Sequence, residues 1–151
     1  MPRIACSCRR LIKDRPFPFV TFFANAQGIA MTVDALIDTG SPYTCLSTKD
    51  LMNSRVPYTK MRGETVYLAG QKFINIQIMD VSLIFRTDTD ELFKVHLEAL
   101  GGLVPTKRTD EVMQEVMHIP SIVGNDFLED HGLVLFYDPK REIAYLETGS
   151  S

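Results

Sequence analysis

One short segment of the sequence combines residue types whose spacing suits catalysis. Asp38-Thr39-Gly40-Ser41 directly follows the apolar run Ala35-Leu36-Ile37, so we expect the carboxyl group of Asp38 at the end of a buried strand. Gly40 allows a tight turn after it, and the small side chain of Ser41 lets another group approach closely. The backbone N–H groups of such a turn can hold a carboxylate and aim it into a cleft. A strand-ending Asp that only caps its own turn fits the same residues, so the segment alone leaves both interpretations open.

The remaining candidate groups lack partners at a useful spacing. Cys6-Ser7-Cys8 could form half of a metal site, but none of the three histidines stands at a ligand spacing: His96, His118 and His131. Cys45 falls within a predicted strand, where a small thiol is expected as core filler. Asp126 falls in a predicted short helix, whose N-terminus its charge would stabilise. The sequence therefore predicts no metal ion and no cofactor.

The elements that must position Asp38 are predicted to be short strands. From residue 17 onward, apolar and β-branched segments alternate with turn residues, at 17–23, 29–33, 35–37, 44–47, 66–68, 72–78, 81–85, 92–97, 122–123, 133–137 and 143–146. Short helices are predicted over 49–54 and 125–131, and 101–120 is polar and mixed, with a helical turn within 110–117. This pattern indicates an all-β, barrel-like domain over residues 17–147. The basic residues 1–16 are expected to form a mobile arm, and 148–151 a tail.

Residues 66–85 carry two further signals. The strand-like segments 66–68 and 72–74 flank Gly70, which suits the tip of a tight hairpin. Apolar side chains then occupy even positions from 74 to 78 and odd positions from 81 to 85. A bulge or sharp bend is therefore predicted at Met79-Asp80, since a continuous strand would swap its buried face there.

Composition and charge exclude several classes of protein. The 151 residues suffice for one domain with a full core, and 45% of them are hydrophobic, which excludes intrinsic disorder. With 16 Lys and Arg against 19 Asp and Glu, the net charge of −3 argues against a nucleic-acid binder. No apolar run approaches the ~18 residues of a membrane span, and the N-terminus lacks the apolar core of a secretory signal. Three cysteines do not form a disulfide framework, so we expect a cytoplasmic protein without membrane or nucleic-acid partners.

Three segments, taken in order, resemble those of the retropepsins, the single-lobed aspartic proteases of retroviruses and their cellular and bacterial relatives. The first is 35–41 followed by Thr44, the second is the glycine-tipped hairpin with its continuation 73–85, and the third is Ile122-Val123-Gly124 followed by a short helix. The resemblance covers about residues 17–146 and implies a small closed β-barrel with one or two short helices. It also implies an aspartic endopeptidase that cleaves extended polypeptides at Asp38, supported by Thr39, Gly40 and Ser41.

Aspartic peptidase chemistry requires two carboxyl groups that share one proton, and this chain has one Asp-Thr-Gly. Asp88-Thr89-Asp90 lacks the glycine, and Glu147-Thr148-Gly149 stands at the end of the chain with no strand leading to a cleft. The resemblance therefore implies a two-fold homodimer with Asp38 from each subunit at the axis, where Thr39 would lock the two loops together. A hairpin over 138–146, as in cellular members, could supply the dimer sheet.

The resemblance assigns the hairpin tip to the family's flap, which would cover the substrate: Tyr67, Leu68, Ala69, Gly70 and Gln71. Tyr67 could contact substrate or pack within its strand, and both possibilities stay open. Many viral members have an acid two residues after the motif's glycine and an arginine after the second motif's glycine. Pro42 and Asn125 stand at these positions, so no buried charge is stranded, but other contacts must secure the dimer.

Two alternatives from other classes remain beside the peptidase. One is a catalytically idle dimer of the same fold that binds extended peptides, and the other is a purely structural dimerisation module. The intact Asp38-Thr39-Gly40 favours the enzyme, because a binding module has no need of a carboxylate pair that is costly to bury. A structural module would not require the flap glycine, Gly70.

Overall fold

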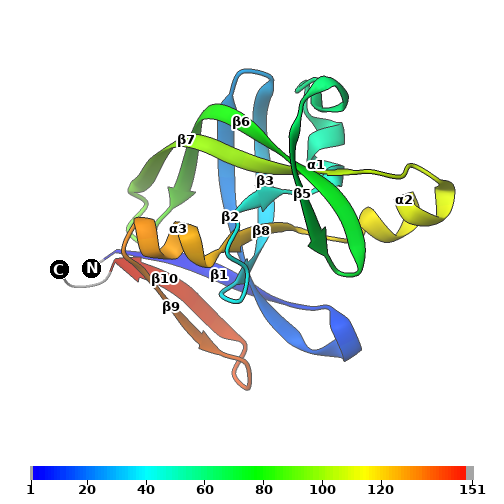
Figure 1. Ribbon diagram of the computed structural model, residues 1–151. Helices are drawn as coiled ribbons and strands as arrows, with labels where there is room; N and C mark the ends of the chain where they lie inside the picture. Colours follow the sequence, from blue (N-terminus) through cyan, green and yellow to red (C-terminus); the bar gives the residue numbers. More distant parts are fainter. Residues whose placement is uncertain (1, 149–151) are drawn as a thin grey trace.

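The computed structural model describes residues 2–148, and the strands within that range form one ten-stranded sheet. The strands are β1 (Arg3–Arg10), β2 (Pro16–Ala26), β3 (Ile29–Asp38), β4 (Cys45–Leu46), β5 (Gly63–Leu68), β6 (Gln71–Arg86), β7 (Leu92–Pro105), β8 (Ser121–Gly124), β9 (Leu133–Asp138) and β10 (Ile143–Thr148). Their order across the sheet is β5-β6-β7-β4-β8-β3-β2-β1-β10-β9. Figure 1 shows three short helices around the sheet, α1 (Thr48–Asn53), α2 (Asp110–Val116) and α3 (Asn125–Asp130). Single 3₁₀ turns lie at Ile12–Asp14 and Tyr58–Lys60.

β6 and β7 form a long antiparallel pair beside β5, at one end of the strand order. The predicted break lies at Asp80, whose φ of 56° is in the left-handed region, and the buried face changes from Ile78 to Val81 across it. The pairing register is the same on both sides of Asp80, so the strand bends without inserting an extra residue. Beyond the bend, Ile84 pairs with Phe23 of β2 as well as with β7, so the sheet doubles back on itself.

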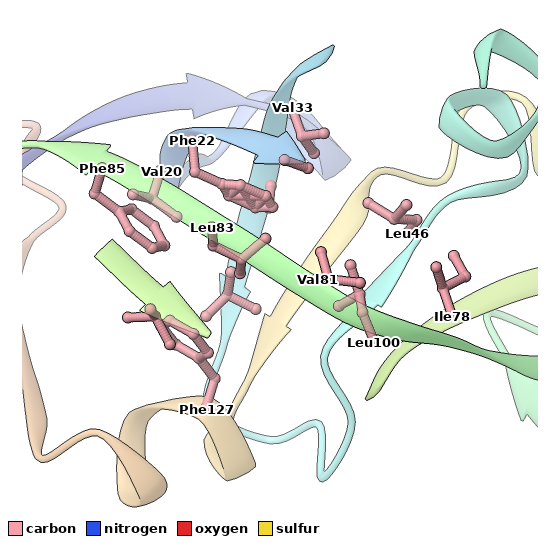
Figure 2. Packing of buried hydrophobic residues seen from close by; sticks show 14 of the residues in the cluster. Val20, Phe22, Val33, Leu46, Ile78, Val81, Leu83, Phe85, Leu100 and Phe127 are labelled. Carbon is pink, nitrogen blue, oxygen red and sulfur yellow. The ribbon is translucent and has the colours of Figure 1, made fainter. Parts of the chain in front are cut away.

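The main core fills the space that this curvature creates. Phe85 belongs to this core, edge-on to Phe22 at 5.4 Å between ring centroids and 5.8 Å from the ring of Phe127. Figure 2 shows Phe127 reaching from α3 toward the side chains of the neighbouring strands. Burying each such side chain contributes about 1.5–3 kcal/mol. The helix that follows the second sequence motif is therefore fixed to the core.

Most of the basic segment that the sequence predicts to have little structure forms a strand. Residues Arg3–Arg10 form β1, which pairs first with β10 and then with β2. The cations obscured an alternation: Ile4 is buried on one face of β1, whereas Arg9 on the other face lies 3.0 Å from Asp34 in an ion pair. Thr148 of the predicted tail ends β10, and residues 149–151 lie outside the described range. The division of the chain into a domain and two ends stays a prediction.

Several predicted elements are confirmed, whereas β7 differs. The hairpin of β5 and β6, the helices α1 and α3, and the C-terminal hairpin of β9 and β10 lie where the sequence predicted them. However, β7 runs on to Pro105 through Gly101-Gly102, inside the segment predicted as polar and mixed. A Cβ on Gly101 would lie 2.5 Å from the Asn75 side chain, so close packing explains a glycine pair that resembles a turn. Within residues 2–148, no helix is long and apolar enough to cross a membrane.

Candidate active site

Two strands that lie far apart in the sequence bring the two motifs together. β3 and β8 are parallel neighbours, with Ile37 opposite Val123 and Asp38 opposite Gly124. Ile37 and Val123 are buried, so the strands are held by the core at the point where their ends meet. Because both strands run in the same direction, the Asp38 turn and the start of α3 emerge side by side at one edge of the sheet.

The turn after β3 holds the carboxyl group of Asp38 with its own backbone. The Gly40 N–H donates to Asp38 Oδ1 at 3.0 Å, and the Ser41 N–H donates to the Asp38 carbonyl at 3.0 Å. Asp38 is half-buried, whereas Thr39 and Gly40 are exposed. The hydrogen bond from Gly40 is the one that a turn-capping Asp would also make, so it fits both interpretations of the motif. The exposure of Thr39 leaves its side chain available for a contact beyond this chain.

Ser41 is the buried member of the motif. Its hydroxyl donates to the Tyr43 carbonyl at 3.0 Å and accepts from the Tyr43 N–H at 3.3 Å. Its carbonyl accepts from the Asn125 N–H at 2.8 Å, which ties the turn to the first residue of α3. At the two positions that depart from viral members, Pro42 is exposed and Asn125 contributes this backbone contact.

Thr44 and Asp126 form a second link between the turn and α3. The Thr44 hydroxyl donates to Asp126 Oδ1 at 2.7 Å and accepts from the Gly124 N–H at 2.9 Å. The Thr44 N–H lies 3.3 Å from Asp126 Oδ2, and the Phe127 N–H donates to Asp126 Oδ1 at 2.8 Å. Asp126 does contact the start of its helix as expected, but it also positions the loop that carries Asp38. Sequence reasoning missed this second role, for which the threonine after the motif was the available signal.

Gly124 is required by the close approach of the turn. A Cβ at this position would lie 2.3 Å from the Tyr43 carbonyl oxygen and 2.7 Å from that of Ser41. Its φ is −92°, so the need is for space and not for an unusual backbone conformation. The glycine of the second motif therefore lets the two motifs pack against each other.

The predicted flap hairpin packs against β8 and its neighbours through its inner face. A second apolar cluster joins the hairpin and α2 to β4, β7 and β8, and consists of Cys45, Phe73, Leu103, Val116 and Ile122 with Val66, Leu68, Val112, Met113 and Ile119 around them. Gln71 also donates a side-chain hydrogen bond to Glu115 of α2. Tyr67 points away and is 74% exposed, so it does not pack within its strand. Ala69 and Gly70 both have positive φ, and no atom lies within 4 Å of a Cβ placed on Gly70.

The thiol of Cys45 lies close to this site but is poorly suited to nucleophilic chemistry. Burial raises the pKa of Cys45 to about 12, and the nearby Asp126 carboxylate adds to the shift. The thiol is therefore protonated at neutral pH, as expected for core filler, whereas nucleophilic attack requires the thiolate. Within residues 2–148, no group of three or more His, Cys, Asp and Glu side chains could hold a metal ion.

A comparison with solved structures found proteins of similar fold. The crystal structure of a retropepsin-like aspartic protease from Rickettsia conorii superposes with a TM-score of 0.56, over 99% of this chain and 93% of that one, at 17% sequence identity. No protein-family model matches the sequence, and no curated protein sequence matches it. The chain therefore has a mostly-β fold similar to that of a retropepsin-like aspartic protease.

Proposed function

We propose that this chain is a retropepsin-like aspartic endopeptidase that works as a homodimer. The observation that carries the proposal is the position of Asp38, at the end of β3 and beside Gly124, in a fold similar to that of an aspartic protease. In this proposal the sheet that doubles back on itself corresponds to the family's closed barrel. Residues Ile122, Val123 and Gly124 then support the turn from the neighbouring strand, as in the family's second motif.

The chemistry would be general acid–base catalysis by a pair of carboxyl groups. Two carboxyl groups about 3 Å apart cannot both ionise, so Asp38 and Asp38 of the partner subunit would share one proton. The ionised group takes a proton from a water molecule as that water attacks the scissile carbonyl carbon. The protonated group donates a hydrogen bond to the carbonyl oxygen. Thr39, which is exposed beside Asp38, would contact the equivalent loop of the second copy.

The hairpin of β5 and β6 would close over an extended polypeptide substrate. Its tip, from Tyr67 to Gln71, carries backbone groups that could pair with a substrate lying as an added strand. Closure would exclude bulk solvent from the carboxyl pair while keeping the attacking water, and the exposed Tyr67 ring would contact the substrate. A cytoplasmic location stays a prediction beside this proposal.

The alternative function is that of an idle dimer that binds extended peptides in the same cleft. It would have every structural feature described above but would not turn over substrate. The intact Asp38-Thr39-Gly40 favours the enzyme, because a binding cleft gains nothing from a carboxyl group whose charge must be desolvated.

Replacement of Asp38 by asparagine tests the proposal. The amide keeps the volume and can still accept from the Gly40 N–H, but it cannot act as the base, so peptide cleavage should fall at least about 10³-fold with the fold intact. The measurement is digestion of a peptide library across pH, read by mass spectrometry. The wild-type rate should be bell-shaped in pH with an acidic optimum, because both limbs belong to the coupled pair.

Asp34→Asn is the matched control, because it makes the same change on the same strand at an ion-paired surface position. It should cleave at the wild-type rate. Turnover that survives in purified Asp38→Asn protein would place the chemistry elsewhere. A wild-type protein that binds library peptides but cleaves none of them at any pH would favour the idle dimer instead.

A further inference from the structure

The loop between β1 and β2 exposes apolar side chains at the tip of a projecting hairpin. Leu11 and Ile12 are 41% and 71% exposed, although both are large hydrophobic residues. The loop is closed by two backbone hydrogen bonds, from the Leu11 N–H to the Arg15 carbonyl at 3.0 Å and from the Arg15 N–H to the Ile12 carbonyl at 3.1 Å. Figure 1 shows this hairpin, in blue, extending away from the body of the sheet. The loop is therefore a hydrogen-bonded turn that keeps two apolar side chains in contact with solvent.

Two exposed cations stand in the same loop as the apolar pair. Lys13 follows Ile12 directly, and Arg15 closes the loop. Within residues 2–148, neither Lys13 nor Arg15 forms an ion pair. The one acid in the loop, Asp14, lies 3.8 Å from Arg10. The loop therefore carries two uncompensated positive charges beside its apolar side chains.

The turn between β9 and β10 brings a further cation to the same end of the molecule. Arg10 forms an ion pair of 3.3 Å with Glu142 of that turn, and the Tyr137 hydroxyl donates to the Pro16 carbonyl at 2.5 Å. A hollow of about 480 Å³ lies between the two turns and is lined by Arg10, Arg15, Pro16, Pro139 and Lys140. Lys140 is exposed and, in the described part of the chain, has no acidic partner. The two turns therefore form one surface, which we call the hairpin-tip surface: Leu11, Ile12, Lys13, Arg15 and Lys140.

We propose that the hairpin-tip surface binds the surface of an anionic phospholipid bilayer, with Leu11 and Ile12 inserted among the lipids and the cations at the lipid phosphate groups. Binding to a bilayer surface depends on the apolar area that is buried and on the attraction between basic side chains and anionic lipids. The formal net charge of the chain is −3, but salt screens charges more than about 10 Å apart, so the charge of the contacting surface decides. Such binding needs no spanning segment, and it runs against the sequence-based expectation of no membrane partner.

A bilayer fits this surface better than a soluble anionic partner does. A nucleic acid or an acidic polypeptide could pair with the cations, but Leu11 and Ile12 would stay in water unless that partner supplied a matching apolar pocket. A bilayer supplies an apolar layer directly beneath its charged one. Two apolar side chains set among uncompensated cations match both layers.

The test is insertion of the tip into vesicles, reported by a single tryptophan. The chain has no tryptophan, so Ile12→Trp supplies one at the tip, and Leu92→Trp supplies a matched one on β7, where Leu92 is 66% exposed. Vesicles of phosphatidylserine and phosphatidylcholine in equal parts should shift the Ile12→Trp emission to shorter wavelength, and lipids brominated along their chains should quench it. The Leu92→Trp emission should not change, and vesicles of phosphatidylcholine alone should change neither.

Co-sedimentation of the full chain with the same vesicles measures the affinity. Lys13→Gln and Lys140→Gln should each weaken binding about 5-fold, as expected for the loss of one basic side chain near the membrane, and Ile12→Ser about 10-fold or more. Lys94→Gln removes an exposed lysine of β7 and should bind as tightly as wild type. Asp38→Asn should also bind as wild type does, because the membrane contact does not rest on the proposed peptidase.

Several outcomes would overturn the membrane contact. These are no binding to the mixed vesicles, equal binding to phosphatidylcholine alone, and an Ile12→Trp emission that does not shift. Soluble polyglutamate that binds the wild-type chain, with the same loss in Ile12→Ser, would assign the surface to an acidic polypeptide instead. A wild-type chain that binds the vesicles but cleaves no peptide would keep the membrane contact and overturn only the peptidase.

Discussion

The turn that carries Asp38 and the tip of the β5–β6 hairpin are both glycine-dependent turns, and they differ in almost every contact. The Asp38 turn is bound to β8 and α3 through Ser41, Thr44 and Asp126. At the hairpin tip, no neighbouring atom lies within 4 Å of a Cβ placed on Gly70. Fixed geometry suits a group that must aim a carboxylate, and an open turn suits a segment that must move. The contrast agrees with the proposed cleft, in which the Asp38 turn would be the rigid side and the hairpin tip the movable side.

The largest expected loss of stability comes from adding a side chain at Gly124. In Gly124→Ala the added methyl group would lie 2.3 Å from the Tyr43 carbonyl oxygen, so the loop must move. We expect a loss of about 3–5 kcal/mol in the free energy of unfolding, measured by urea denaturation, and loss of any cleavage activity. Gly70→Ala adds the same methyl group in open space and should lose only about 1 kcal/mol, from its positive φ. Similar losses of unfolding free energy in the two variants would contradict the contrast between a fixed Asp38 turn and an open hairpin tip.

A smaller loss of stability is expected from removing the Thr44 hydroxyl, which joins the two motifs. Thr44→Val keeps the side-chain shape but leaves the Gly124 N–H and the Asp126 carboxylate without this partner. The expected loss in the free energy of unfolding is about 2–3 kcal/mol. Thr65→Val makes the same change at an exposed position of β5 and should stay within about 0.5 kcal/mol of wild type. A Thr44→Val protein as stable as its control would mean that the link to Asp126 is not needed.

The sequence predicts those features of the two turns that depend only on residues close together along the chain. The Asp38 turn, the hairpin tip at Gly70 and the bend at Asp80 each follow from local alternation and turn chemistry. Position along the chain does not predict that Thr44 bonds Asp126, or that β3 pairs with β8, because these contacts join segments about eighty residues apart. β1 was missed for a different reason, since its outward cations hid the alternation of its buried face.

The contacts of the hairpin limit the part of it that can open. An isolated two-stranded ribbon is only marginally stable, but here Val66, Leu68 and Phe73 hold the inner face of the hairpin against α2 and the site strands. Gln71 is further tied to Glu115 of α2. Opening is therefore expected at the turn around Ala69-Gly70, and not along the whole hairpin.

A loss of stability smaller than that of Thr44→Val, with a selective effect on turnover, is expected from Gly70→Val. A β-branched side chain resists the left-handed region, where Gly70 has φ 77°, so the tip should be strained by about 1–2 kcal/mol. Gly132→Val is matched to it, because Gly132 has φ 60° and nothing within 4 Å of its added Cβ, outside the proposed cleft. Both variants should lose similar stability, but only Gly70→Val should lose kcat/KM, by about 10-fold or more, because its tip must close over substrate. Equal kinetic losses in the two variants, or hydrogen exchange at the tip as slow as in β3, would remove the lid from the mechanism and leave the hairpin as a fixed wall.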